Sequence, residues 1–225
     1  MWCVGELDEE YIQKLEDVLE LYEKPLNPAE PVVCLDEKPV TLHKDVRAPK
    51  PAAPGRIAKR DSEYERCGTA NVFCAVEPKA GRHYTRPTAN RCAAEFAQIL
   101  AELALNYTTA NTIHLVVDNL NIHCRKSVLA YYGEVAGANL WKRFTIHYTP
   151  KHGSWLNQAE IEISMFSREC LGTRRVPTLA SLQDEARAWN SKANEARRTI
   201  NWRFNRKDAR RTLGYRKYFS KRSEH

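Results

Sequence analysis

Two short apolar runs of the chain each end in an aspartate: VVCLD ends at Asp36, and IHLVVD ends at Asp118. Short, continuous runs rich in β-branched residues are typical of strands that are buried on both faces. In folds that contain such strands, ligands and catalytic groups gather at the carboxyl ends of the strands. If the two strands are neighbours, the two carboxylates lie side by side.

A third acid comes from the segment 147–168, which begins as a loop and continues as a helix. Glu160 and Glu162 flank the apolar stripe of this helix, roughly 80° to either side of its centre at about 100° per residue. Each acid can be a solvated residue at the edge of the stripe or a metal ligand, and the helix alone does not distinguish the two. The stripe repeats at steps of three and four residues and should be buried: Leu156, Ala159, Ile163, Phe166 and Cys170.

Three carboxylates that meet in one place repel one another unless cations neutralise them. At about 4 Å each pair costs roughly 1 to 4 kcal/mol, depending on the effective dielectric constant. Carboxylate ligands without cysteine or histidine favour Mg²⁺ or Mn²⁺. Two such ions, roughly 3.5–4 Å apart, activate a water or a 3′-hydroxyl and stabilise the leaving oxygen of a phosphodiester. The pattern therefore indicates metal-dependent phosphoryl transfer, and the alternative is that each aspartate only forms a turn or caps a helix.

The elements that would position these acids alternate along the chain. Apolar patterning predicts strands at 32–38, 68–77, 81–88, 113–118 and 143–148, and Asp36 ends the apolar run of the first. It predicts helices at 8–24, 89–105, 125–135 and 178–196, in addition to the one after 154, and it places Cys92 on the apolar face of the second. This order predicts an α/β fold whose central mixed sheet contains antiparallel and parallel pairs.

Composition narrows the class of protein. A chain of 225 residues is long enough for one domain with a good core and a small appendage. The seven cysteines include no CxxC pair, which argues against a zinc ribbon and a disulfide framework. No apolar run reaches the length of a membrane span and the N-terminus lacks the layout of a signal peptide, so we expect a cytoplasmic protein without a membrane partner.

The charge is unevenly distributed. Residues 1–37 hold eleven acids against Lys14 and Lys24, a balance of −9, and because the whole chain carries +7 the remainder carries +16. A body this basic favours a polyanionic partner such as DNA, although basic surfaces also keep proteins in solution. The candidate DNA-binding residues lie in a proline-rich loop at 44–61 and in the tail: Lys44, Arg47, Lys50, Arg56, Lys59, Arg60, Arg203, Arg206, Arg210 and Arg211. The alternatives are a flexible tether for the loop and a solvated helix face for the tail.

Three blocks of the chain together resemble the catalytic blocks of mariner-type DDE transposases, in their bacterial insertion-sequence branch. They are CLDEK at 34–38, VVDNLNIH at 116–123 and HYTPKHGSWLNQAEIE at 147–162, and the similarity extends from about residue 30 to NWRF at 201–204. The resemblance implies an RNase H-like fold, a sheet flanked by helices, and DNA cleavage and strand transfer with two Mg²⁺ or Mn²⁺ ions. By position it makes Asp36, Asp118 and Glu160 the metal-binding triad and so selects Glu160 over Glu162.

The same resemblance implies supporting residues, partners and boundaries. Residues that match the surroundings of the site are Asn119, His123, His152 and Asn157. The implied partners are DNA, as element ends and target, and a second copy of the chain in a homodimer associated with the nucleoid. We expect an acidic helix and linker at 1–30, the catalytic domain at 31–200 and a basic tail at 201–225, with 131–142 as an inserted turn.

Relatives carry helix-turn-helix domains ahead of the catalytic domain, and the short acidic start of this chain does not resemble one. We therefore expect a catalytic domain without its DNA-reading half, which would be inactive in transposition on its own. Two alternatives remain open at this point. One is an RNase H-like nuclease that cuts without strand transfer, and the other is a truncated remnant that binds DNA without catalysis.

Overall fold

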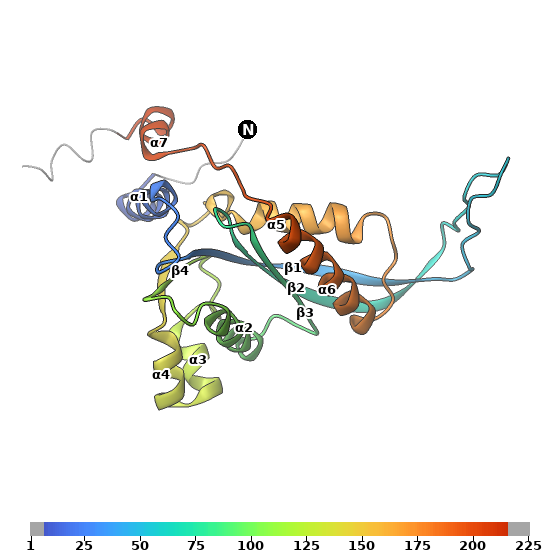
Figure 1. Cartoon of the computed structure of the whole chain (residues 1–225), viewed down its shortest axis with the longest axis horizontal. Helices are drawn as coiled ribbons and strands as arrows, with labels where there is room; N and C mark the ends of the chain where they lie inside the picture. The colour runs from blue at the N-terminus through green and yellow to red at the C-terminus, as the bar shows by residue number, and fades with distance from the viewer. Residues whose placement is uncertain (1–6, 216–225) are drawn as a thin grey trace, which may run out of the picture.

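A five-stranded mixed sheet forms the centre of the computed structural model, which describes residues 7–215 (Figure 1). The strand order is β3-β2-β1-β4-β5. The strands are β1 (Val32–Asp45), β2 (Tyr64–Glu77), β3 (Arg82–Thr88), β4 (Ile113–Val117) and β5 (Phe144–Tyr148). β1, β2 and β3 pair antiparallel, whereas β1, β4 and β5 pair parallel, so the predicted mixed sheet is confirmed. Residues 1–6 and 216–225 of the predicted terminal segments lie outside the described residues.

Helices cover both faces of the sheet. They are α1 (Glu9–Glu23), α2 (Ala93–Asn106), α3 (Arg125–Tyr132), α4 (Glu134–Trp141), α5 (Ala159–Phe166), α6 (Leu179–Ala196) and α7 (Arg206–Leu213). A 3-10 turn, Ser154–Leu156, precedes α5, and a π turn, Ser167–Leu171, follows it. No described helix is long and apolar enough to cross a bilayer.

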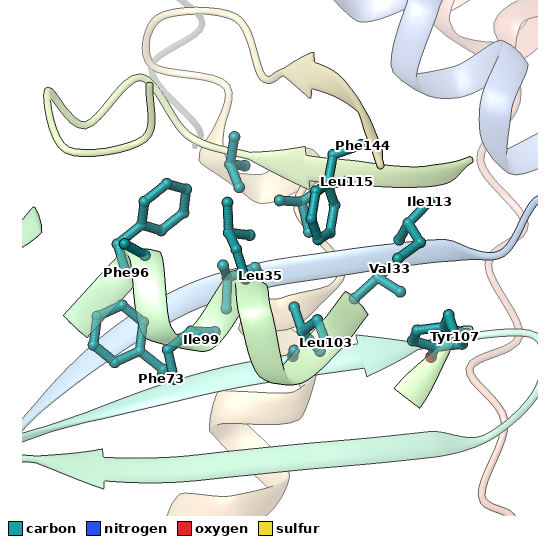
Figure 2. Packing of buried hydrophobic residues seen from close by; sticks show 14 of the residues in the cluster. Val33, Leu35, Phe73, Phe96, Ile99, Leu103, Tyr107, Ile113, Leu115 and Phe144 are labelled. Atoms are coloured by element: carbon teal, nitrogen blue, oxygen red, sulfur yellow. The ribbon is translucent and has the colours of Figure 1, made fainter. Parts of the chain in front are cut away.

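Alternation along β1 decides which side chains face which helices. Val33 and Leu35 pack against α2 in one core, where Phe96 and Leu103 of α2 meet them (Figure 2). Cys34 points to the opposite face, into the core that α1 and the start of α5 complete. Because successive strand side chains alternate between faces, Asp36 lies on the α1 and α5 face.

The first strand is longer than predicted. β1 does not end at Lys38 but continues to Asp45, because Val40 and Leu42 are buried beneath the π turn and α6. The loop predicted at 44–61 begins within β1, and residues 46–63 form the irregular outer part of the β1–β2 hairpin, with bridges between Lys50 and Lys59 and between Ala53 and Arg56. We call this segment the arm; it projects away from the body of the protein (Figure 1).

Two helix predictions need correction. α2 starts at Ala93 rather than at residue 89, because the Asn90 side chain accepts a hydrogen bond from the Cys92 backbone at 3.1 Å and holds a turn there. Cys92 is consequently exposed instead of buried. The helix predicted at 125–135 is broken at Gly133, which has φ of 80°, and 131–142 is no inserted turn because most of it forms α4.

The acidic first helix forms as predicted and packs on the body. Asp8 caps α1 by accepting a hydrogen bond from the Tyr11 backbone at 2.7 Å. The acidic face of α1 contacts the basic α7, where Arg210 pairs with Glu16 at 2.6 Å and Arg206 with Glu23 at 2.9 Å. Part of the charge asymmetry of the sequence is therefore neutralised inside the molecule.

Candidate active site

Asp36 and Asp118 are brought together by strand register. β1 and β4 are parallel neighbours, with Cys34 opposite Val116, so the two aspartates follow at equivalent positions two residues further on. Cys34 and Val116 belong to the same core, and alternation therefore directs both aspartates to the α1 and α5 face. The condition set by the sequence, that the two strands be neighbours, is met.

Glu160 enters the same region from the first turn of α5. The pKa of Asp36 is raised to about 7: burial is the main cause, the hydrogen bond from the Glu37 backbone opposes it, and the negative charges of Glu37, Asp118 and Glu160 add to it. All three predicted acids thus act on one another electrostatically. Such mutual repulsion is what a divalent cation relieves, so this all-oxygen set fits Mg²⁺ or Mn²⁺ in chemistry.

The three carboxylates do not, however, form a closed set of ligands. Within residues 7–215 no three His, Cys, Asp or Glu side chains make a group that could hold a metal ion as they stand. Asp36 instead accepts a hydrogen bond from the Glu37 backbone at 2.8 Å, and Asp118 accepts one from the Leu120 backbone at 3.0 Å.

His123 fixes the position of Asp118. Its Nδ1 donates to the Asp118 carboxylate at 2.7 Å and its Nε2 donates to Glu37 at 2.8 Å. Burial alone would lower the pKa of His123, but the hydrogen bonds to Asp118 and Glu37 raise it to about 9. The imidazolium therefore links β1 to the loop after β4, with the Phe96 ring packed 4.8 Å from it.

Two predicted supporting asparagines also act through the backbone. Asn157, 1% exposed, donates to the Leu35 carbonyl at 2.8 Å and so joins the start of α5 to the residue before Asp36. Asn119 donates to the Thr149 carbonyl at 2.6 Å and joins the loops after β4 and β5. His152 lies exposed in the second of these loops, in left-handed backbone with φ of 61°.

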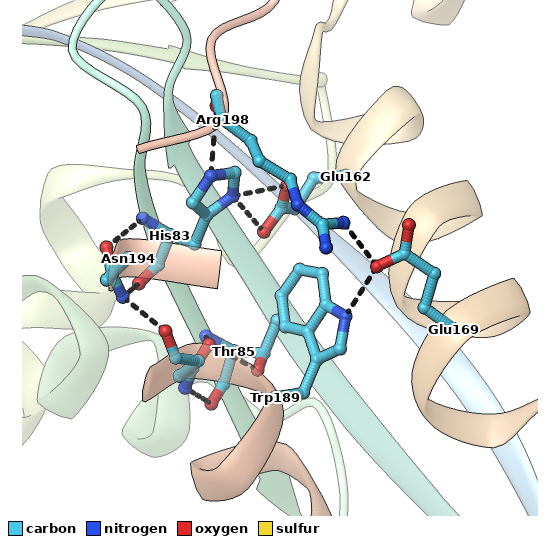
Figure 3. A network of polar contacts seen from close by, with 8 residues as sticks. His83, Thr85, Glu162, Glu169, Trp189, Asn194 and Arg198 are labelled. Atoms are coloured by element: carbon cyan, nitrogen blue, oxygen red, sulfur yellow. Dashed lines mark hydrogen bonds and ion pairs between the residues drawn. The ribbon is translucent and has the colours of Figure 1, made fainter. Parts of the chain in front are cut away.

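Glu162, the other acid of α5, points away from the three carboxylates. Both of its oxygens lie 2.9 Å from His83 Nδ1, and His83 Nε2 donates to the Arg198 carbonyl at 3.0 Å (Figure 3). Arg198 itself pairs with Glu169, which also accepts from Trp189. Glu162 is thus occupied in a buried network, whereas the charge of Glu160 contributes to the raised pKa of Asp36.

The candidate DNA-binding residues divide into two groups. Arg47 pairs with Asp61, Arg60 with Asp45, Lys44 with Glu65, Arg206 and Arg210 with α1, and Arg211 with Asp208. Within the described part of the chain, Lys50, Arg56, Lys59 and Arg203 form no ion pair. Three of these four cations lie in the exposed arm.

Sequence reasoning missed Glu37 and His83. Glu37 faces the α2 side of the sheet, opposite Asp36, and only the contact with His123 gives it a role. The alternation of side chains along β1 predicts which face of the sheet Glu37 lies on. No local pattern, however, pairs Glu37 with His123, 86 positions further along the chain. The sequence likewise gave no indication of a role for His83, because its partner Glu162 lies 79 positions further along the chain.

The fold and the site define a class: a mixed sheet flanked by helices, with acids within β1, directly after β4 and on a covering helix, is the RNase H-like fold. Residues 31–183 match the family described as DDE superfamily endonuclease. The chain belongs to this family, and the family-level resemblance of its three sequence blocks is confirmed; the bacterial branch stays a prediction.

Solved structures support the fold assignment. The Mos1 mariner paired-end complex with Mn matches with a TM-score of 0.52 and 15% identity, over 88% of this chain and 61% of that chain. The Mos1 strand transfer complex matches with a TM-score of 0.55 and 15% identity, over 88% of this chain and 60% of that chain. The chain therefore spans about 60% of the length of these proteins. No curated protein sequence matches it.

Proposed function

We propose that this chain is a transposase catalytic domain, which cleaves DNA strands and joins the resulting 3′-hydroxyl to target DNA. The observation that supports the proposal most is the parallel register of β1 and β4, which puts Asp36 and Asp118 at equivalent positions, with Glu160 close enough for its charge to raise the pKa of Asp36. The family supplies the reaction class, endonucleolytic cleavage. Related folds were solved as a paired-end complex and a strand transfer complex of Mos1.

Asp36, Asp118 and Glu160 would hold two divalent ions. When bound, such ions polarise the phosphodiester and stabilise the leaving oxygen. His123 keeps Asp118 oriented and ionised through the short hydrogen bond to its carboxylate. Asn157 holds the start of α5 against β1, and so limits how far Glu160 can move from Asp36.

DNA is the proposed partner, as element ends and as target, together with a second copy of the chain. The Mos1 relatives were solved with Mn and with Mg, as complexes of paired transposon ends. In this chain the arm carries Lys50, Arg56 and Lys59 away from the body, where they are exposed to a DNA backbone or to a second protomer. Both roles suit a segment that buries little of its own surface.

The test is nicking of supercoiled plasmid in Mn²⁺ by the full chain, compared with Asp118→Asn and with Glu134→Gln as a control at an exposed acid of α4. We expect nicking by the wild type and by Glu134→Gln, and its loss in Asp118→Asn. Equal nicking by all three proteins would reject the site.

A second assay separates strand transfer from cleavage alone. A labelled duplex with a free 3′-hydroxyl is incubated with plasmid, and covalent joining of the label is scored. Nicking without joining would favour the RNase H-like nuclease. Binding of DNA without either product would favour the non-catalytic remnant.

A further inference from the structure

A cavity of about 590 Å³ adjoins the candidate active site, and Glu160 is part of its wall. The rest of the wall comes from the outer face of α5, from Trp155, and from Phe204 with the end of α7. The cavity opens to solvent, because Ile161 and Arg168 in its wall are exposed. A DNA strand whose phosphodiester lies at Glu160 therefore has this cavity directly beside it.

The outer face of α5 and of the π turn after it gives the cavity its length. The residues of this face recur at steps of three and four, so they lie along one side of the helix: Ile161, Ser164, Met165 and Arg168. At about 1.5 Å per residue, the distance along the helix from Glu160 to Arg168 is roughly 12 Å. One strand of DNA rises about 3.4 Å per nucleotide, so this wall is as long as roughly three nucleotides.

Arg168 places a cation at the end of the wall remote from Glu160. The side chain is exposed and forms no ion pair with any residue in the range 7–215. Its neighbour in the sequence, Glu169, pairs with Arg198 instead. A guanidinium without an acidic partner can donate two parallel hydrogen bonds to a phosphate.

Aromatic rings form another part of the wall. The rings of Trp155 and Phe204 meet edge to face, with centroids 5.5 Å apart, and both side chains are only half-buried. Trp202 Nε1 donates a hydrogen bond to the Phe204 carbonyl at 2.7 Å, which holds the backbone of this segment in place. Nucleobases of any sequence stack on accessible rings, and proteins that bind single strands combine such rings with cations along the backbone.

We propose that this cavity receives an unpaired base of the DNA strand that is cleaved at the three acids, while Arg168 contacts a phosphate of the same strand. The preferred substrate is then DNA whose base pairing is opened beside the reacting bond, and not a continuous duplex. The inference rests on the proposed function, because the acids are what bring the strand to Glu160.

Three DNA ligands separate the base from its phosphate. They are a blunt duplex, the same duplex with a short single-stranded overhang, and that duplex with an overhang of abasic sugars, each tested with the overhang at the 3′ and at the 5′ end. Binding to the full chain is measured by fluorescence anisotropy in Ca²⁺, which also takes oxygen ligands. We expect the overhang with bases, at one of the two ends, to bind about fivefold or more tightly than its abasic counterpart, in line with one stacked base.

Two variants test the two halves of the contact, and a thermal melt confirms that each is folded. Phe204→Leu keeps an apolar side chain but removes the ring, so the preference for bases over abasic sugars should shrink. Arg168→Gln should weaken both overhangs alike and leave that preference intact. Tyr132→Leu is the matched control, because its partly exposed ring lies on α3 and outside the cavity wall, and it should bind like wild type.

Equal affinity of wild type for the overhangs with and without bases would overturn the inference. So would a preference that survives unchanged in folded Phe204→Leu, or self-association of the chain that Phe204→Leu abolishes, since the cavity would then serve a second copy. Nicking of plasmid by wild type reports on the proposed function separately. Nicking without the preference for bases counts against this cavity alone, and the preference without nicking counts against the proposed catalysis alone.

Discussion

His83 and Glu162 form a pair whose side chains are completely buried, with His83 Nδ1 2.9 Å from both carboxylate oxygens. The other ring nitrogen faces the Arg198 carbonyl, which can only accept a hydrogen bond. A proton must therefore lie on each side of the ring, one toward the Arg198 carbonyl and one toward Glu162. The pair is then either imidazolium and carboxylate or imidazole and carboxylic acid, and in both forms its net charge is zero. It anchors α5 to β3 two residues beyond Glu160 (Figure 3).

Removal of His83 should destabilise the fold strongly. In His83→Ala the acid Glu162 remains buried without its partner, and we expect the free energy of unfolding to fall by about 3–5 kcal/mol. Urea denaturation followed by circular dichroism measures the change. His43→Ala is the matched control, because its partly exposed ring only packs 4.5 Å from Tyr64. Similar losses in the two variants would contradict a special role for the buried pair.

His123→Gln should weaken metal-supported nicking while the protein stays folded. Glutamine cannot donate to Asp118 and Glu37 at once, and residues that orient metal ligands typically contribute about 10–100-fold in metal affinity or activity. Nicking is titrated against Mn²⁺, and a thermal melt confirms folding. His114→Gln, at the opposite end of β4, should leave the Mn²⁺ requirement unchanged. An unaltered Mn²⁺ titration in His123→Gln would show that His123 does not orient the site.

Gly81→Ala should be more damaging than Gly55→Ala. Both glycines have positive φ, 64° and 73°, so either alanine is strained by about 1–2 kcal/mol. At Gly81 a Cβ would also lie 2.5 Å from the Arg197 carbonyl carbon, whereas at Gly55 it meets no atom within 4 Å. We expect a further loss of about 1–3 kcal/mol in Gly81→Ala, measured by urea denaturation. Equal stabilities would mean that segment 197–198 moves away without cost.

Charge removal from the arm should lower the salt dependence of DNA binding. Each phosphate contact contributes about 0.9 to the slope of log K against log salt, so replacing Lys50, Arg56 and Lys59 by alanine should reduce its magnitude by up to about 2.7. Fluorescence anisotropy with duplex DNA at several salt concentrations measures the slope. In Arg206→Ala the slope should change less, because that guanidinium already pairs with Glu20 and Glu23. The reverse order would identify α7 as the DNA-binding surface.

The sequence by itself determined the strands, most helices and the positions of Asp36 and Asp118. Apolar alternation and the three-and-four repeat are local properties, so they survive in whatever topology the chain adopts. The sequence did not determine where these elements end. β1 continues to Asp45 because its later residues are buried beneath α6, and the positive φ of Gly133 separates α3 from α4.

Only the tertiary structure decided what the second acid of α5 does. Glu160 and Glu162 are equivalent by spacing, and the family resemblance favoured Glu160. The structure adds that His83, a residue of β3, reaches Glu162 across the fold. The pairing of α7 with α1 and the link from His123 to Glu37 likewise join segments far apart in the chain. Such contacts depend on how sheet order and helix packing bring side chains together, and local patterns carry no record of that.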